Sequence, residues 1–257
     1  TSAVGGLVSM WAGKSTTLAG GLVSIAGGVS TERTGGGVSV ASGEGTATSS
    51  GVVTIRSANS GASGVSGSLV FSSGTALKGN SGNLMIGTGA ATDGRGGLVS
   101  ISAGSGTSGA GGLVSILSGR STVHTGGALS ITSGEGTGTS SGVVTIRSAN
   151  SGASGVSGSL VFSSGTSLKG NSGNIMIGTG AATTGRGGLV AISAGSGTSA
   201  VGGLVSMWAG KSTTLAGGLV SIAGGVSTLS TGGGVNVASG EGTATSSGVV
   251  TIRSANS

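Results

Sequence analysis

The chain has 257 residues, of which 62 are Gly and only 6% are charged, and it contains no Pro, Cys or Tyr. The lack of Cys excludes a disulfide framework, a thiolate metal site and a cysteine nucleophile, and the lack of Pro excludes a collagen helix. The net charge of +6 is spread thinly with almost no aromatic residues, which argues against nucleic-acid binding, and no run approaches the roughly 18 apolar residues of a membrane span.

A repeated glycine organises the whole chain. It marks seventeen units, and successive marks are fifteen positions apart except for two steps of sixteen. This repeat glycine, numbered position 0 below, stands at residues 6, 21, 36, 51, 67, 82, 97, 112, 127, 142, 158, 173, 188, 203, 218, 233 and 248. A unit of this length is too short for a helical repeat and fits one turn of a solenoid.

Each unit opens with an alternating segment. Positions 2 and 4 are apolar, whereas position 3 between them is mostly Ser or Thr, a period that predicts one short strand per unit. We expect the side chains at positions 2 and 4 to form an inward core ladder, which begins with Val8, Met10, Val23, Ile25, Val38, Val40, Val53, Ile55, Leu69 and Phe71. Position 7 is nearly always Gly, so we expect turns with positive φ on either side of the strand.

These units predict an all-β fold, a parallel β-solenoid with about 15 residues per coil, seventeen coils, a narrow two-sheet core and no caps. Backbone hydrogen bonds to the coils above and below would stabilise it. Residues 1–257 would form one continuous repeat array, in which 1–60 match 198–257 with three differences. Because capping segments are missing, we expect the array to be a window on a longer chain or filament.

The segment VSMWAGKSTT, Val8 to Thr17, resembles a nucleotide-binding loop in its Gly-Lys-Ser-Thr and returns at 205–214. A phosphate-binding loop needs Gly five residues before its Gly-Lys and a helix after it. Here Val8 takes the place of that Gly and another repeat follows. We therefore expect no nucleotide and no other cofactor, and interpret Lys14 as a charge at the edge of the fold.

Threonine recurs at position 10 in twelve of the sixteen complete units. The first members of this Thr ladder are Thr16, Thr31, Thr46, Thr92, Thr107, Thr122 and Thr137. A regular Thr array resembles ice-binding proteins, which gives an alternative function. Leu77 and Leu168 interrupt the ladder and suggest that it faces inward or is half-buried.

The other side of the predicted strand carries a recurring set of apolar residues at positions 1, 3 and 5. These residues are Leu7, Trp11, Leu22, Val70, Met85, Leu98, Leu113, Leu117, Val161, Met176, Leu189, Leu204, Trp208 and Leu219. A recurring apolar stripe indicates a contact surface. A loop or a glycan could cover it, but we favour lateral packing against another solenoid.

The sequence contains few residues that could carry out catalysis. His124 is the only histidine and has no counterpart in other units, and the five acidic residues form no evident pair. Calcium-binding solenoids need recurrent Asp, whereas this chain has only Asp93. We expect neither enzyme activity nor a metal site.

The consensus GGLVSISAGSGTS, found at 96–108 and with one exchange at 187–199, resembles tandem Gly/Ser/Thr-rich arrays in large secreted or surface proteins of algae and other single-celled eukaryotes. The resemblance implies an extracellular fibre or surface appendage. We therefore expect a structural protein that forms a stiff filament or stalk outside the cell or at its surface by self-association. Ser and Thr could carry O-glycans. Bacterial adhesin stalks and phage fibres share the architecture, so a carbohydrate-binding adhesin stalk is a further alternative.

Overall fold

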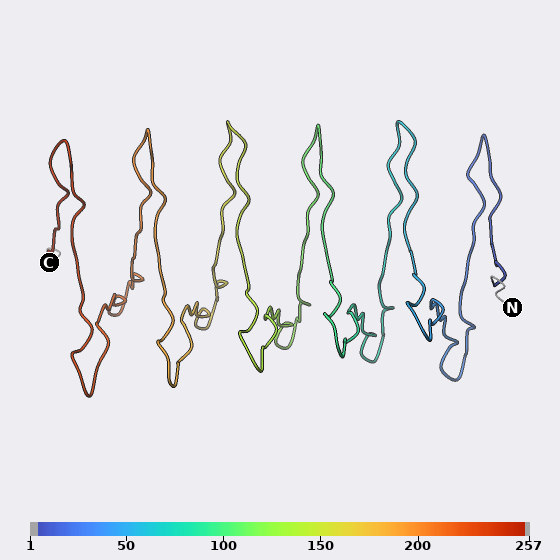
Figure 1. The fold of residues 1–257 in the computed structure, drawn as a ribbon, viewed down its shortest axis with the longest axis horizontal. Coiled ribbons are helices and arrows are strands. Elements are labelled where there is room, and N and C mark those ends of the chain that lie inside the picture. The colour runs from blue at the N-terminus through green and yellow to red at the C-terminus, as the bar shows by residue number, and fades with distance from the viewer. Residues whose placement is uncertain (1–4, 255–257) are drawn as a thin grey trace. The chain divides into compact units, whose positions relative to one another are not determined.

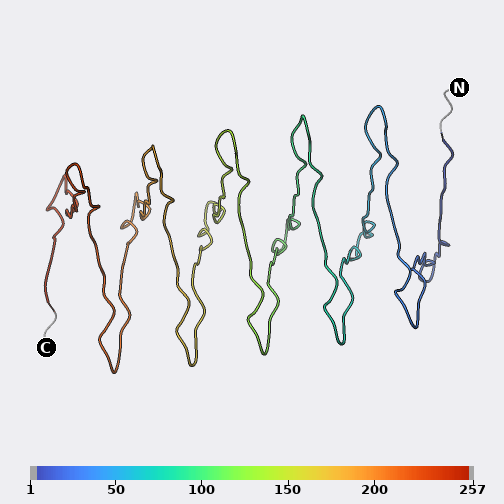
Figure 2. The same ribbon diagram turned by 90° about the horizontal axis from the view of Figure 1, so that it is seen from below.

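The computed structural model of the chain describes residues 5–254 and contains neither a helix nor a strand in that range. The chain divides into two units, Thr1–Leu129 and Ser130–Ser257. In each unit the ribbon runs in long extended segments that end in narrow reversals, as two perpendicular views show (Figures 1 and 2). The architecture is thus a regular series of reversals joined by extended backbone.

The reversals follow the sequence repeat. Fourteen are three-residue bends at positions 10–12, and two are turns in the two repeats that are one residue longer than the others. In the first unit they lie at 16–18, 31–33, 46–48, 62–63, 77–79, 92–94, 107–109 and 122–124. In the second they lie at 137–139, 153–154, 168–170, 183–185, 198–200, 213–215, 228–230 and 243–245. The backbone therefore reverses its direction once in every repeat of the sequence.

A backbone hydrogen bond closes most of these reversals at their base. The repeat glycine donates its N–H to the carbonyl oxygen of the position 7 glycine in the preceding repeat, at 2.8–2.9 Å. The ten bonds of this kind start from Gly21, Gly36, Gly51, Gly112, Gly127, Gly142, Gly203, Gly218, Gly233 and Gly248. We call the segment from position 7 to the next repeat glycine, such as Gly13–Gly21, a loop, whether or not this bond closes it, and the segment from position 0 to position 6 an arm.

The prediction of a parallel β-solenoid is wrong, because residues 5–254 contain no strand and hence no sheet. A solenoid needs hydrogen bonds between residues that are about one full coil apart in sequence. The repeat glycines instead bond across about half that separation, within one loop, as Gly21 does to Gly13. The same glycines that would align neighbouring coils are used to close individual reversals.

The expectation of positive φ at the turns is also wrong. No residue between 5 and 254 has a positive φ, glycine included. Glycine is needed for close approach instead: a Cβ on Gly21 would lie 2.8 Å from the nitrogen of Gly13, and one on Gly45 would collide with the carbonyl oxygen of Ser49. The two sides of a loop come together only because a side chain is missing.

The predicted core does not form within this chain. No apolar side chain among residues 5–254 is buried. This applies to every residue of the expected core ladder, Val8, Met10, Val23, Ile25, Val38, Val40, Val53, Ile55, Leu69 and Phe71. The physical reason is that an inward ladder needs an opposite wall, and without sheets the extended segments have none.

The accessible surface measures how open this conformation is. It is 25386 Å² for a chain of 23.2 kDa. A compact protein of that mass exposes roughly 9,700 Å², and its extended chain roughly 34,000 Å². The chain is therefore ordered in its path but hides only about a quarter of the surface that an extended chain exposes.

Candidate assembly surface

Most of the exposed large apolar side chains lie on the arms. The fourteen residues expected to make lateral contacts all lie on arms and are between 77% and 90% exposed. They are Leu7, Trp11, Leu22, Val70, Met85, Leu98, Leu113, Leu117, Val161, Met176, Leu189, Leu204, Trp208 and Leu219. The arms therefore leave a recurring set of large apolar side chains open to solvent.

Exposure alternates along most arms with the two-residue period of the sequence, although in the first arm Leu7 and Val8 are equally exposed. In the arm that starts at Gly21, Leu22 is 86% exposed and Val23 is 46% exposed. The same contrast holds between Leu98 and Val99 and between Leu189 and Val190. Most arms thus have one side that is more exposed than the other, and successive side chains point to opposite sides as extended backbone requires.

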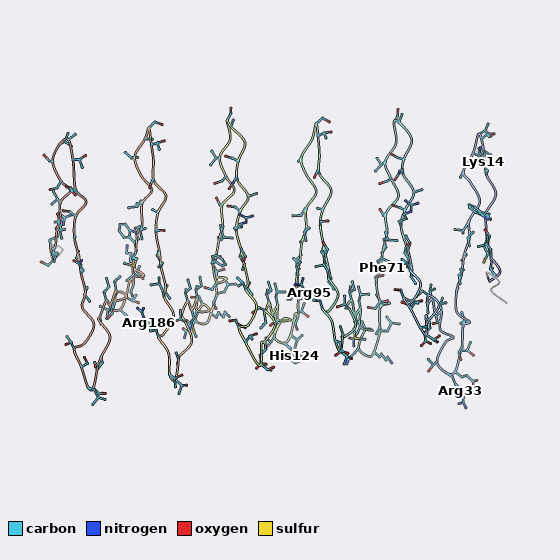
Figure 3. All side chains as sticks on the ribbon, in the orientation of Figure 1. Lys14, Arg33, Phe71, Arg95, His124 and Arg186 are labelled. Atoms are coloured by element: carbon cyan, nitrogen blue, oxygen red, sulfur yellow. The ribbon has the colours of Figure 1, made fainter. Side chains whose placement is uncertain are left out.

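Charge is concentrated in the reversals rather than in the arms. Thirteen of the sixteen Lys, Arg, Asp and Glu residues lie between positions 8 and 13 of their repeats. Figure 3 shows Lys14 and Arg33 on two successive loops and Phe71 on an arm. The exceptions are Arg56, Arg147 and Arg253, which occupy position 5 of three arms of identical sequence. Charge therefore lies mainly in the loops, which also carry exposed apolar side chains such as Leu77 and Leu168.

Two kinds of residue at position 9 shape the bends. Six bends have Ser there, and its Oγ accepts a hydrogen bond from the N–H of position 12 at 2.9–3.0 Å. These serines are Ser15, Ser30, Ser121, Ser167, Ser212 and Ser227. Five other bends have Gly at position 9, where a Cβ would collide with a carbonyl oxygen on the far side of the bend. A Ser side chain thus supports six bends and a missing side chain makes room for five, whereas the three other bends have Ala at this position.

The residues beside these bends are the least exposed in the chain. Within 5–254 only eight residues are half-buried, and all are Gly or Ser at positions 6 and 9. They are Gly27, Gly45, Ser57, Ser133, Gly136, Ser212, Gly224 and Gly242. Sequence reasoning missed this role of positions 6 and 9, although the restriction of position 9 to Ser, Gly and Ala was a visible signal. Among residues 5–254, local packing is therefore tightest just before the base of a loop, at position 6, and just before its bend, at position 9.

A second bond type crosses the base of two loops that lack the glycine bond. The Thr88 hydroxyl donates to the carbonyl oxygen of Gly97, and the Thr179 hydroxyl to that of Gly188, both at 3.3 Å. Threonine occupies position 6 only in these repeats. A side chain here holds the two sides of the reversal together in place of a backbone amide.

The two tryptophans are the largest side chains of the arms. Trp11 and Trp208 are both 89% exposed. The Trp208 Nε1–H donates to the Oγ of Ser206, which lies on the same side of the extended backbone two residues earlier. The polar atom of Trp208 thus has a partner within its own arm, whereas the ring remains open.

The Gly-Lys-Ser-Thr segments lie at the base of loops. The Gly13 carbonyl accepts the bond from Gly21, and Ser15 Oγ accepts from Leu18 N–H at 2.9 Å. Ser212 and Leu215 repeat this arrangement. A bend begins at the Thr of each segment, Thr16 and Thr213, where phosphate binding would use a helix N-terminus.

The Thr ladder residues each begin a bend. This holds for Thr16, Thr31, Thr46, Thr92, Thr107, Thr122 and Thr137. The expectation that this position is half-buried is wrong, because Leu77 and Leu168 at the same place in their bends are fully exposed. The Thr residues of the ice-binding alternative thus lie at the ends of loops.

The remaining sequence candidates come together in no cluster. His124 ends the bend 122–124, where its N–H donates to Ser121 Oγ at 2.9 Å. Nowhere between residues 5 and 254 do three or more His, Asp or Glu side chains gather as a metal site would require. The same residues include no helix of the length and hydropathy that crossing a membrane would require.

The chain matches no protein-family model, no curated protein and no solved structure. The case for its function therefore rests on the arms and loops described above.

Proposed function

We infer that this chain is a structural protein, a building unit of an extracellular filament or surface stalk that self-associates through its repeats. The observation that carries this proposal is the amount of ordered but uncovered surface, 25386 Å² on a 23.2 kDa chain. Apolar burial is the main favourable term in folding and association, so apolar arms repeated throughout the sequence favour association strongly. The secreted or surface location is part of the same proposal and follows from the sequence resemblance.

Sedimentation and negative-stain electron microscopy test this function. The chain is expected to form elongated particles above a threshold concentration. Tryptophan fluorescence supplies a second readout, because Trp11 and Trp208 are exposed in the single chain and would shift to shorter wavelength when covered. Dispersed monomers with unshifted fluorescence at high concentration would contradict the proposal.

The two alternatives have their own measurements. An ice-binding protein would produce thermal hysteresis through the Thr residues at the bends. An adhesin would give saturable binding on a glycan array. A positive result in either, from a chain that stays monomeric, would replace the structural proposal.

A further inference from the structure

The backbone of the arms is as open as their side chains. Residues 5–254 contain twelve backbone–backbone hydrogen bonds, and all lie within loops or turns. Folded proteins have roughly one hydrogen bond per residue, about two-thirds of them between backbone groups. The amide and carbonyl groups of the arms therefore resemble those of an unpaired edge strand on both sides.

This property restricts what can cover the arms. A lipid surface would bury the apolar side chains but leave the backbone amides without partners, which is costly in an apolar medium. Another extended protein backbone satisfies both the side chains and the amides. The occupant is thus a polypeptide that presents extended segments of its own.

The extent and spacing of the arms restrict the occupant further. The exposed surface exceeds that of a compact protein of this mass by roughly 16,000 Å², whereas a standard protein interface buries about 1,200–2,000 Å² in total. A partner must therefore meet arms throughout the chain. To do so it needs extended segments that recur with the same period as the arms, and a second copy of this chain has that spacing by construction.

The distribution of charged residues indicates which part of the second copy makes contact. Arms other than those with Arg56, Arg147 and Arg253 are uncharged, whereas the loops carry thirteen charged residues. Every Lys, Arg, Asp and Glu between residues 5 and 254 is exposed. Uncharged apolar arms can be desolvated at little cost, but charged side chains are expensive to bury.

We propose that the arms pair with the arms of a second copy, extended backbone against extended backbone, and that the charged loops stay in water outside the contact. This inference rests on the proposed function, since it names the partner and the surface of that self-association. The proposed pairing also gives Arg56, Arg147 and Arg253 a role in setting the register between the two copies. Parallel pairing without offset would place each guanidinium opposite its own copy, so an offset that separates them is favoured.

Spin labelling tests the surface directly. The chain has no native Cys, so a single introduced Cys is the only label site. Ser24→Cys places the label on an arm, and Thr31→Cys places it at a bend in the same repeat. In assembled protein, the Ser24 label is expected to become immobile and at least 5-fold less accessible to a water-soluble relaxation agent, whereas the Thr31 label changes less than 2-fold. A shielded Thr31 label beside a mobile Ser24 label would overturn the inference.

A matched pair of charge substitutions gives a second test. Ile25→Asp places a carboxylate on an arm, whereas Val29→Asp places it at position 8, where Glu44 and Glu135 stand in other repeats. Ile25→Asp is expected to raise the concentration needed for assembly at least 10-fold and Val29→Asp less than 2-fold. Equal effects would overturn the inference.

Different results would contradict the structural function and the pairing of the arms. If electron microscopy shows filaments while the arm labels stay mobile, the arm pairing is wrong and the structural function stands. If no particles larger than monomers form, the structural function is wrong. Shielding of the Ser24 label by neutral phosphatidylcholine vesicles, without protein assembly, would show that lipid is the occupant and overturn the arm pairing.

Discussion

Single side chains at position 9 decide how each bend is held, and the chain contains a natural comparison of two of them. Residues 74–80 and 165–171 have the same sequence except that Ala76 stands in place of Ser167. Ser167 Oγ accepts a hydrogen bond from Gly170 N–H at 3.0 Å, and the methyl group of Ala76 accepts none from Gly79. One oxygen atom is therefore the only difference between two otherwise equal bends.

This difference predicts unequal amide exchange. A hydrogen bond of this type contributes about 1 kcal/mol, which corresponds to roughly 5-fold slower exchange at Gly170 than at Gly79. Residue-resolved hydrogen exchange by NMR measures both amides in one sample. Ser167→Ala should speed exchange at Gly170, and Ala76→Ser should slow exchange at Gly79. Equal rates in the unmodified chain would show that the serine bond does not order the bend.

At the scale of the element, the loop depends on glycine for space rather than for unusual φ. A Cβ on Gly45 would collide with the Ser49 carbonyl oxygen, whereas a Cβ on Gly43 would meet nothing within 4 Å. Gly43 also accepts the closing bond from Gly51 N–H at 2.9 Å. Two glycines in one loop thus have different roles, and only one excludes a methyl group.

Substituting each glycine by alanine separates these roles. Gly45→Ala should open the loop at a cost of about 1–3 kcal/mol, as expected for overpacking, and should speed exchange of the Gly51 amide. Gly43→Ala is the control and should leave the Gly51 amide within about 2-fold of its original rate. If both variants behave alike, the close approach at Gly45 does not restrict the bend.

The elements also show what sequence could predict. The spacing of Gly6, Gly21 and their successors matches the spacing of the bends, and the apolar alternation matches the alternation of exposure along the arms. The predictions of strands, sheets and a core were wrong. The alternation at Val23 and Ile25 shows which side of an extended segment is apolar, but it does not show which other segment would cover that side. That choice depends on non-local pairing, whereas the bond from Gly21 to Gly13 is local.

The positions of the apolar and charged residues could be read from the sequence, whereas lateral contact through the arms stays a prediction. The fourteen apolar arm residues were identified from their positions alone, and they are highly exposed in the structure. The partition of charge into loops was also present in the sequence, at Lys14, Glu44 and Arg120 among others. The bend-forming serines and glycines were missed, because their role depends on distances of a few ångströms within each loop.

At the scale of the whole molecule, net charge opposes the association that the arms favour. Each copy carries +6, of which the exposed loops contribute +3 and the three arm residues Arg56, Arg147 and Arg253 contribute the other +3. Between about 0.01 M and about 1 M salt the screening length falls from about 30 Å to about 3 Å, so repulsion between copies is largely removed. Burial of the apolar arms does not depend on charge and remains.

Salt is therefore expected to promote assembly. The concentration at which half of the chains are assembled, measured by sedimentation, should fall roughly 3- to 10-fold over that range of ionic strength, since about 1 kcal/mol of repulsion is screened. A control in an uncharged osmolyte separates screening from general exclusion effects. If the copies were instead joined by ion pairs between loops, for example Arg120 with Glu135, salt would dissolve the assemblies. Assembly that weakens as salt rises would thus assign the contact to the loops and leave the apolar arms without a role in it.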